Sequence, residues 1–314
     1  MLTAFGKVIL LGEHAVVYGR PALAVGLPGA LVLESCISRP GPFRVRVFCA
    51  GIEESDGSDT SDTVLGEVLR LLKKRLGDGD GGCEILVRST IRFGAGLGSS
   101  AALSVLLVRA IAAAKGIACA DEEVRSRAHE LEKHFHGNPS GIDDTVATYG
   151  GLCLFRRGGW DGVPGGLPGA QAVTPEALVL PGRPIPLVIG DTGVPRATRD
   201  VVAGVRRRWE DDRKGTEAIF DRIGKCVLRG ARAISEGDVA GLAGAMRENQ
   251  TVLAGLGVSI PEIDAMVRLA LDAGAEAAKL TGAGGGGCVI ALAPGKKDRV
   301  LDAWRAAGFH AWIP

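Results

Sequence analysis

The spacing of hydrophobic and polar residues changes several times along the chain, and each spacing predicts a type of element. Apolar residues that alternate or run continuously between glycines and prolines predict strands at residues 4–11, 22–34 and 43–49. Residues 53–62 are rich in Ser, Asp and Gly, which predicts a polar loop. Leucine and valine then recur at helical spacing, so a helix is expected over 63–76.

The middle of the chain predicts a buried helix followed by an exposed one. The glycine-rich run 77–82 predicts a turn, and a strand is expected over 83–91. Residues 99–114 are apolar on every face, which is typical of a helix enclosed by the core. Residues 121–135 are charged and amphipathic, so their helix should lie at the surface.

The second half predicts a mainly helical segment closed by strands. A strand is expected at 187–191, after a proline-rich stretch, and we place a domain boundary between residues 184 and 185. Ser259 and Glu262 have the spacing of a capping box that opens a helix. Three further helices are predicted before this capped helix, at 199–213, 215–235 and 238–254. A strand, a glycine loop, a strand and a helix are expected after it.

Composition narrows the class of protein. The 314 residues have room for about two domains. A formal net charge of +1 and only 8 Phe, 4 Trp and 2 Tyr argue against nucleic acid as the main partner. Seven scattered cysteines without a CxxC pattern predict free thiols in a reducing compartment. The longest apolar run, 101–114, is too short to span a bilayer, and no signal peptide is evident, so we expect a cytoplasmic protein.

Glycine is the compositional outlier, with 47 residues, about twice the average usage. One cluster lies between a predicted strand and the apolar helix, where the free N–H groups of a helix N-terminus attract phosphate. The alternative is a tight turn with serine caps. Neither the dinucleotide fingerprint nor the Walker A pattern fits this cluster. The candidate phosphate-binding residues are Gly94, Ala95, Gly96, Leu97, Gly98, Ser99, Ser100 and Ala101.

A second glycine cluster, residues 282–287, fits the G-x-G-x-x-G spacing. A strand rather than a helix follows it, so the dinucleotide interpretation is rejected. Five glycines in six positions instead predict that this backbone passes close to a ligand or another loop, with a hairpin turn as the alternative.

A polar segment at 136–144 ends in the carboxylates Asp143 and Asp144. Histidines precede it, but the step from His129 to His134 is one residue too long for a zinc helix of the HExxH type. Zinc is therefore not expected. Taken alone, Lys7 and the Glu13-His14 pair read as ordinary solvated residues.

Three segments together resemble the signature motifs of the GHMP kinase superfamily: KVILLGEHAVVYG (7–19), GAGLGSSAA (94–102) and KLTGAGGGGC (279–288). Within it, HGNPSGIDDTVATYGG (136–151) and DTGVPRATRDVVAGV (191–205) are similar to the mevalonate kinases. The resemblance implies a two-domain α+β fold: an N-terminal domain (1–184) with a left-handed βαβ unit and a ferredoxin-like C-terminal domain (185–314). One departure is Arg92-Phe93, where the family usually has proline before the first glycine.

The resemblance implies ATP- and Mg²⁺-dependent phosphorylation of the 5-hydroxyl of mevalonate, in the mevalonate route to isoprenoids. By position, Asp143 is the expected catalytic base and Lys7 its partner, both also near the substrate. Ser100 and Glu132 match the magnesium ligands. The remaining substrate-side positions match Glu13, His14, Arg196, Thr198 and Ala283. Asp144 is expected to contribute little to activity.

Other functions stay open at this point. A phosphomevalonate kinase would need an additional basic cluster, and Arg206–Arg208 reads as a solvated helix face. Another GHMP small-molecule kinase is a second alternative. A catalytically silent, ligand-sensing homologue is the third, and it would be expected to lack one of Lys7, Ser100, Glu132 and Asp143. A homodimer is the habit of the family, although no unambiguous apolar interface is visible in the sequence.

Overall fold

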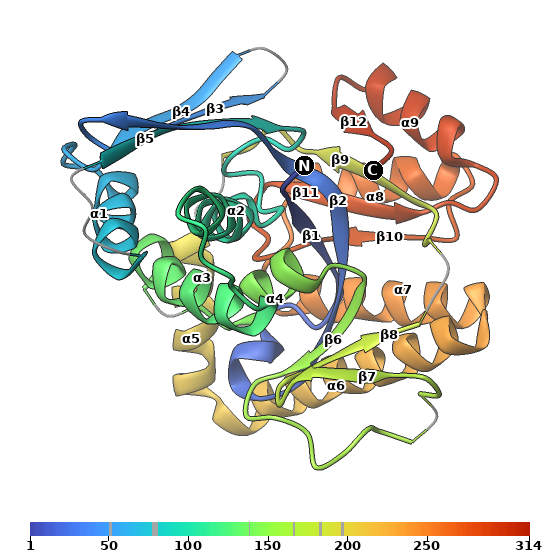
Figure 1. The fold of residues 1–314 in the computed structure, drawn as a ribbon. Helices are drawn as coiled ribbons and strands as arrows, with labels where there is room; N and C mark the ends of the chain where they lie inside the picture. Colours follow the sequence, from blue (N-terminus) through green and yellow to red (C-terminus); the bar gives the residue numbers. More distant parts are fainter. Residues whose placement is uncertain (50–51, 77–80, 138, 166, 182–183, 196–197) are drawn as a thin grey trace. The chain divides into compact units, whose positions relative to one another are not determined.

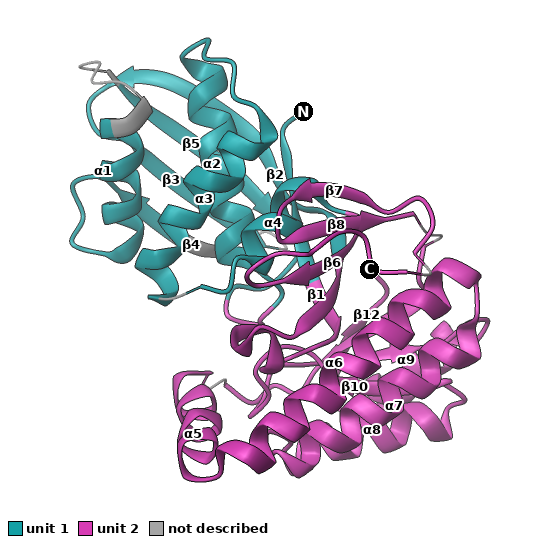
Figure 2. Ribbon diagram, turned by 90° about the horizontal axis from the view of Figure 1, so that it is seen from below, with its two compact units in different colours: residues 1–7, 26–93, 97–150 teal, residues 8–25, 94–96, 151–314 magenta. Residues whose placement is uncertain are grey.

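The chain alternates strands and helices from β1 (Thr3–Leu11) to β12 (His310–Trp312) (Figure 1). This computed structural model describes residues 1–49, 52–76, 81–137, 139–165, 167–181, 184–195 and 198–314. The chain forms two compact units (Figure 2). Unit 1 comprises residues 1–7, 26–93 and 97–150, and unit 2 comprises residues 8–25, 94–96 and 151–314.

Unit 1 contains a sheet in the order β4-β3-β5-β2. Its strands are β2 (Pro21–Pro40, which continues from unit 2), β3 (Arg44–Cys49), β4 (Ile52–Ser58) and β5 (Gly81–Ser89). Strands β3 and β5 are parallel, with α1 (Val64–Leu76) in their connection, so the predicted βαβ unit is present. The expected polar loop at 53–62 is wrong over its first part, because β4 pairs there with β3. Backbone pairing supplies this strand without an alternating sequence pattern.

Three helices of unit 1 carry the chemistry described below: α2 (Ser99–Ala114), α3 (Asp121–His136) and α4 (Ile142–Tyr149). Helix α2 is buried along most of its length and contacts α3 and α4, which confirms the predicted central helix. The polar segment at 136–144 ends in a helix, because α4 begins at Ile142 and Asp143 lies in its first turn. Gly141 precedes that turn with φ of 94°, and acidic side chains are favourable beside a helix N-terminus.

Unit 2 contains two sheet portions. The first part of β2 pairs with β6 (Leu152–Arg156), which leads to β8 (Ala177–Leu180) and β7 (Gln171–Thr174). A separate antiparallel sheet has the order β10-β11-β9-β12, where β9 is Leu187–Asp191, β10 is Ala277–Leu280 and β11 is Cys288–Leu292. In chain order this sheet reads 2-3-1-4, the ferredoxin-like arrangement that the resemblance implies.

The helices of unit 2 begin and end within two residues of the predicted positions where ranges were predicted. They are η1 (Ala15–Tyr18), α5 (Thr198–Asp211), α6 (Arg213–Glu236), α7 (Val239–Gly255), α8 (Pro261–Asp272) and α9 (Lys297–Ala306). Their apolar faces meet the second sheet in a core that includes Phe220, Met266 and Trp304. The predicted capping box is wrong: α8 begins at Pro261, and the Ser259 hydroxyl donates to Asp264 instead. Proline at the first helical position needs no N–H acceptor.

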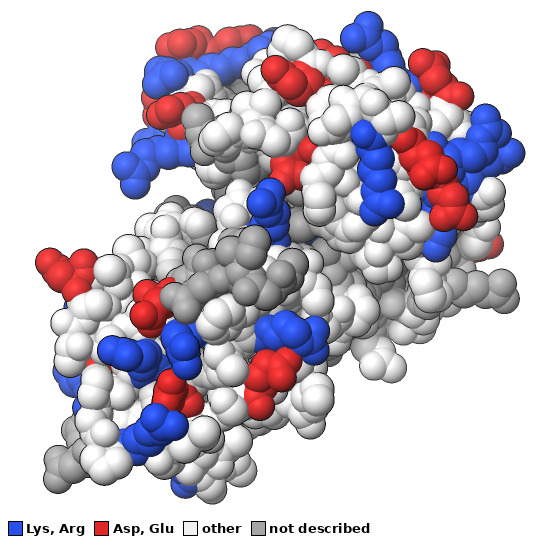
Figure 3. All heavy atoms as spheres, turned by 90° about the horizontal axis from the view of Figure 1, so that it is seen from above, with Lys and Arg blue, Asp and Glu red and all other residues white. Residues whose placement is uncertain are grey.

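The surface charge, the helix lengths and the domain boundary complete the description of the fold. Acidic and basic side chains are interspersed on the face drawn in Figure 3, as expected for a nearly neutral chain. Among the described residues, no helix is long and apolar enough to cross a membrane. The division into packing units does not decide the domain boundary between residues 184 and 185, which stays a prediction.

Candidate active site

The first glycine loop ends in an uncapped helix N-terminus. Gly94, Gly96 and Gly98 have φ of 80°, 77° and 74°, a region that other residues rarely adopt. Helix α2 starts at Ser99, and no side chain from the described part of the chain caps it. Its first N–H groups and the positive end of the helix dipole are therefore available to an anion.

Ser100 and Glu132 are in direct contact. The Ser100 hydroxyl donates to Glu132 Oε2 over 3.0 Å, and Ser104 donates to Oε1 over 3.2 Å. The Glu132 side chain is only 1% exposed. Burial, with the nearby charge of Asp143, raises the pKa of Glu132 to about 8 despite these hydrogen bonds. A cation at this position would favour the ionised carboxylate.

The donor set of this pair fits magnesium. A hydroxyl and a carboxylate are hard oxygen ligands, and Mg²⁺ takes its remaining ligands from phosphate and water. Within the described ranges, no three His, Cys, Asp or Glu side chains gather as a protein-only metal cluster. An ion that brings most of its own ligands is the kind that two protein oxygens can hold.

His136 is a residue of this site that sequence reasoning missed. Its Nε2 atom lies 3.0 Å from Ser100 Oγ and 3.7 Å from Glu132 Oε2. The signal was present, because His136 follows Glu132 by four residues and α3 continues through both.

Lys7 and Asp143 form an ion pair beside the glycine loop. Lys7 Nζ lies 2.9 Å from Asp143 Oδ1, with the lysine buried and the aspartate 29% exposed. The backbone N–H of Lys7 donates to the Leu97 carbonyl over 2.7 Å. A Cβ on Gly98 would lie 2.9 Å from Lys7 Cγ, so this glycine lets the loop pack against the lysine. The pair therefore lies next to the N-terminus of α2.

Asp144, the next residue in the same helical turn, is buried. Its carboxylate accepts from His129 Nδ1 at 3.1 Å and from Arg125 at 3.4 Å, both on α3. Its side chain is 0% exposed, and burial raises its pKa above the ordinary value. Asp144 thus ties α4 to α3, the helix that carries Glu132. Residue spacing gave no indication of this contact.

His14, in unit 2, has an unusual backbone. Its φ of 62° and ψ of −50° place it at the centre of a γ-turn, closed by the Ala15 N–H donating to the Glu13 carbonyl. It is the one residue other than glycine with positive φ in the described chain. Such strain is concentrated at functional sites. His14 Nε2 lies 2.8 Å from the Ala283 carbonyl, and burial lowers the pKa of the imidazole.

Glu13 forms a buried ion pair with Lys279. Both side chains are 0% exposed, and Lys279 Nζ donates to Glu13 Oε1. Nearby, the Thr281 hydroxyl donates to the Ile9 carbonyl and accepts from the Ile9 N–H. The first and third sequence motifs are therefore joined within unit 2, although Ile9 and Thr281 are 272 positions apart in the chain.

The second glycine loop passes close to other backbone segments, as predicted. A Cβ on Gly284 would lie 2.2 Å from the Val258 carbonyl oxygen, and one on Gly286 would lie 2.6 Å from that of Val194. The same loop places the Ala283 carbonyl against His14. These approaches explain the density of glycine here.

Two predicted substrate residues, Arg196 and Thr198, stay predictions. Arg196 lies outside the described residues. Thr198 is the first residue of α5 and is exposed. The structure thus gathers Lys7, Ser100, Glu132 and Asp143 in unit 1, and Glu13, His14 and Ala283 in unit 2.

Comparison with known proteins agrees with this geometry. A family model for the N-terminal domain of GHMP kinases matches residues 63–151, and one for their C-terminal domain matches residues 231–310. The mevalonate kinase of Pyrococcus horikoshii is 33% identical, with 98% of this chain and 92% of that protein covered. That of Aeropyrum pernix is 34% identical, with 96% and 90% covered. A crystal structure of L. major mevalonate kinase with R-mevalonate aligns with a TM-score of 0.77 and 26% identity, covering 99% of this chain and 94% of that one.

The fold and these similarities define a small-molecule kinase. The chain belongs to the GHMP kinases and, within them, to the mevalonate kinase family.

Proposed function

We propose that the protein transfers the γ-phosphoryl group of ATP to the 5-hydroxyl of mevalonate, giving 5-phosphomevalonate and ADP. The observation that carries the proposal is the Lys7–Asp143 ion pair at 2.9 Å, which lies beside an uncapped helix N-terminus. The choice of substrate rests on the relatives. They are mevalonate kinases, and their similarity to this chain extends over nearly its whole length. Residues 1–184 would form the N-terminal kinase domain and residues 185–314 the C-terminal one.

The first glycine loop and the start of α2, residues 94–101, bind the phosphates of ATP in this proposal. Backbone N–H groups need no side chain to reach an anion, and they lie where the helix dipole is positive. Ser100 and Glu132 hold Mg²⁺, which when bound neutralises phosphate charge during transfer. His136, which contacts both groups, orients the Ser100 hydroxyl.

Asp143 accepts the proton of the substrate hydroxyl. At the same time the hydroxyl oxygen bonds to the γ-phosphorus, and the bond between the γ-phosphorus and the β-phosphate oxygen of ADP breaks. A carboxylate is a weak base for an alcohol, so a nearby cation is needed to stabilise the negative charge that develops on the oxygen. Lys7 Nζ lies within hydrogen-bond distance of Asp143 and supplies that charge. Partial burial of the pair strengthens this interaction, since water screens it less.

The substrate side of the proposal uses residues of unit 2. His14, whose pKa is lowered by burial, stays neutral and presents a fixed ring beside Ala283. Glu13 is held by Lys279 and keeps the strained turn in place. Arg196 is the proposed partner of the substrate carboxylate, and Thr198 lies close to it in sequence. We further propose a cytoplasmic location and a homodimer.

Parallel measurements of Mg²⁺-dependent ADP release with mevalonate and with 5-phosphomevalonate test this function. Turnover with mevalonate alone is expected. Turnover only with 5-phosphomevalonate would make the protein a phosphomevalonate kinase. Silence with both, while ATP still binds, would favour another acceptor alcohol or a ligand-sensing homologue.

A further inference from the structure

Two cysteines of unit 1, neither of them assigned a role above, lie in contact. Cys36 is on β2 and Cys83 on β5, and their sulfur atoms are 2.8 Å apart, with one thiol donating to the other. The strand register pairs Ser38 with Cys83. Since Cys36 precedes Ser38 by two residues, both sulfurs face the same side of the sheet. The spacing of the cysteines along the chain does not relate these two residues, and only the strand register reveals the pair.

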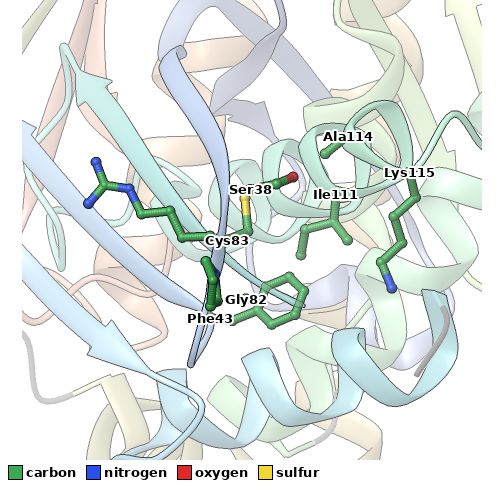
Figure 4. A pocket seen from close by; sticks show the side chains of 9 residues that line it. Ser38, Phe43, Gly82, Cys83, Ile111, Ala114 and Lys115 are labelled. Atoms are coloured by element: carbon green, nitrogen blue, oxygen red, sulfur yellow. The ribbon is translucent and has the colours of Figure 1, made fainter. Parts of the chain in front are cut away.

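The two thiols differ in accessibility. Cys83 is buried and Cys36 is partly exposed. Cys83 also lines a pocket of about 350 Å³, together with Ser38, Phe43, Ile111 and Lys115 (Figure 4). The hydrogen bond from Cys83 lowers the pKa of the Cys36 thiol, which favours its thiolate. The more reactive thiol is therefore that of the partly exposed Cys36, and its partner sulfur already lies in contact with it.

We propose that Cys36 and Cys83 form a dithiol site that small hydroperoxides oxidise to a disulfide. The Cys36 thiolate attacks the peroxide oxygen, the O–O bond breaks, and Cys36 becomes a sulfenic acid while an alcohol, or water from hydrogen peroxide, is released. The Cys83 sulfur then attacks the Cys36 sulfur. The S–O bond breaks, a second water leaves with the Cys83 proton, and the disulfide forms. Both thiols are oxidised by two electrons in total, and the peroxide is reduced.

For the bond to form, the two sulfur atoms must approach from 2.8 Å to about 2.05 Å. The bridge would close a segment that contains β3, β4 and α1. Lys7, Ser100, Glu132 and Asp143 all lie outside that segment. Oxidation should therefore raise thermal stability and leave the proposed active site intact.

The test treats the native full-length protein with hydrogen peroxide and counts thiols after unfolding, with peptide mapping by mass spectrometry. We expect seven thiols to fall to five, a loss of about 2 Da, and a Cys36–Cys83 linked peptide. The melting temperature should rise by about 5 °C and return when a dithiol reductant is added. Cys36→Ser and Cys83→Ser should each lose this response, whereas Cys119→Ser, which changes a partly exposed cysteine on another segment, should keep it.

Seven thiols remaining in peroxide-treated protein would overturn the proposal, as would a linked peptide that joins other cysteines. Bridge formation without a change in melting temperature would overturn the stabilising effect. Mapping of the unsubstituted protein gives a decision even if a serine variant fails to fold. None of these readouts depends on the proposed kinase activity.

Discussion

Lys7 and Asp143 come from opposite ends of unit 1 in sequence, yet their charged atoms lie 2.9 Å apart. The lysine backbone is fixed by its hydrogen bond to Leu97, at the end of the glycine loop. The ion pair and the N-terminus of α2 are therefore positioned by the same short segment. In the proposed reaction, this arrangement would place a lysine of strand β1 beside phosphates bound at that helix N-terminus.

Lys7→Met should reduce kcat/KM by about 10²-fold, because the methionine keeps the packing against Gly98 but removes the charge beside Asp143. Steady-state ADP release measures the effect. Lys225→Met, at an exposed position of α6, is the control and should retain wild-type activity. Equal activity of both variants would show that Lys7 is structural.

The strained turn at His14 should distinguish glycine from alanine. Both His14→Gly and His14→Ala remove the contact with the Ala283 carbonyl, so both should raise KM for mevalonate. Glycine accepts a φ of 62° and alanine does not, so His14→Gly should be more stable to urea by about 1 kcal/mol or more. Equal urea midpoints would mean that the turn relaxes in the variants.

Asp144 should matter for stability, although it is expected to contribute little to activity. Asp144→Ala leaves Arg125 and His129 without their buried carboxylate and should cost about 3 kcal/mol in urea unfolding. Asp121→Ala is the matched control, because it breaks an ion pair with Arg109 whose aspartate is 58% exposed. That variant should lose less than about 1 kcal/mol. Similar losses in the two variants would contradict the role of Asp144 in holding α4 to α3.

Glu132 should make stability depend on pH when Mg²⁺ is absent. Its pKa is about 8 in the folded protein and near 4.5 when unfolded, so the folded state binds the extra proton between these values. This stabilising contribution is complete below pH 4.5 and is lost as the pH rises through about 8. The slope should be at most about 1.4 kcal/mol per pH unit.

Urea titrations of the Mg²⁺-free protein across this range measure the slope, and Glu132→Gln should reduce it. The raised pKa of Asp144 acts in the same direction, so part of the dependence should remain. Stability that instead increases with pH over this range would show that Glu132 is ionised in the free protein.

The elements with strong periodicity could be predicted from sequence, and those that depend on pairing could not. The buried helix α2 was predicted closely because its sequence is apolar on every face, and the charged helix α3 because its apolar residues recur at helical spacing. Strand β4 was missed, since a polar segment carries no alternation and its strand form arises from pairing with β3. Helix α8 begins at Pro261 rather than after a Ser259 cap, because proline is favoured at the first position of a helix.

The same distinction applies to the site. The glycine loop and its serines are contiguous, so their positions follow from the local sequence. The Asp144–His129 contact and the Cys36–Cys83 pair depend on how helices pack and how strands align. No spacing rule relates such residues, and only the folded chain shows them.

The most direct test of the account is the turnover of Asp143→Asn at saturating ATP, Mg²⁺ and mevalonate, with ATP binding measured by calorimetry on the same sample. We expect kcat to fall by about 10²-fold or more while ATP affinity stays within about 3-fold of the wild type, because asparagine keeps the shape but cannot accept the proton. Asp302→Asn, exposed on α9, should leave both quantities unchanged. An Asp143→Asn enzyme that keeps more than about a tenth of wild-type kcat would contradict the assignment of Asp143 as the catalytic base.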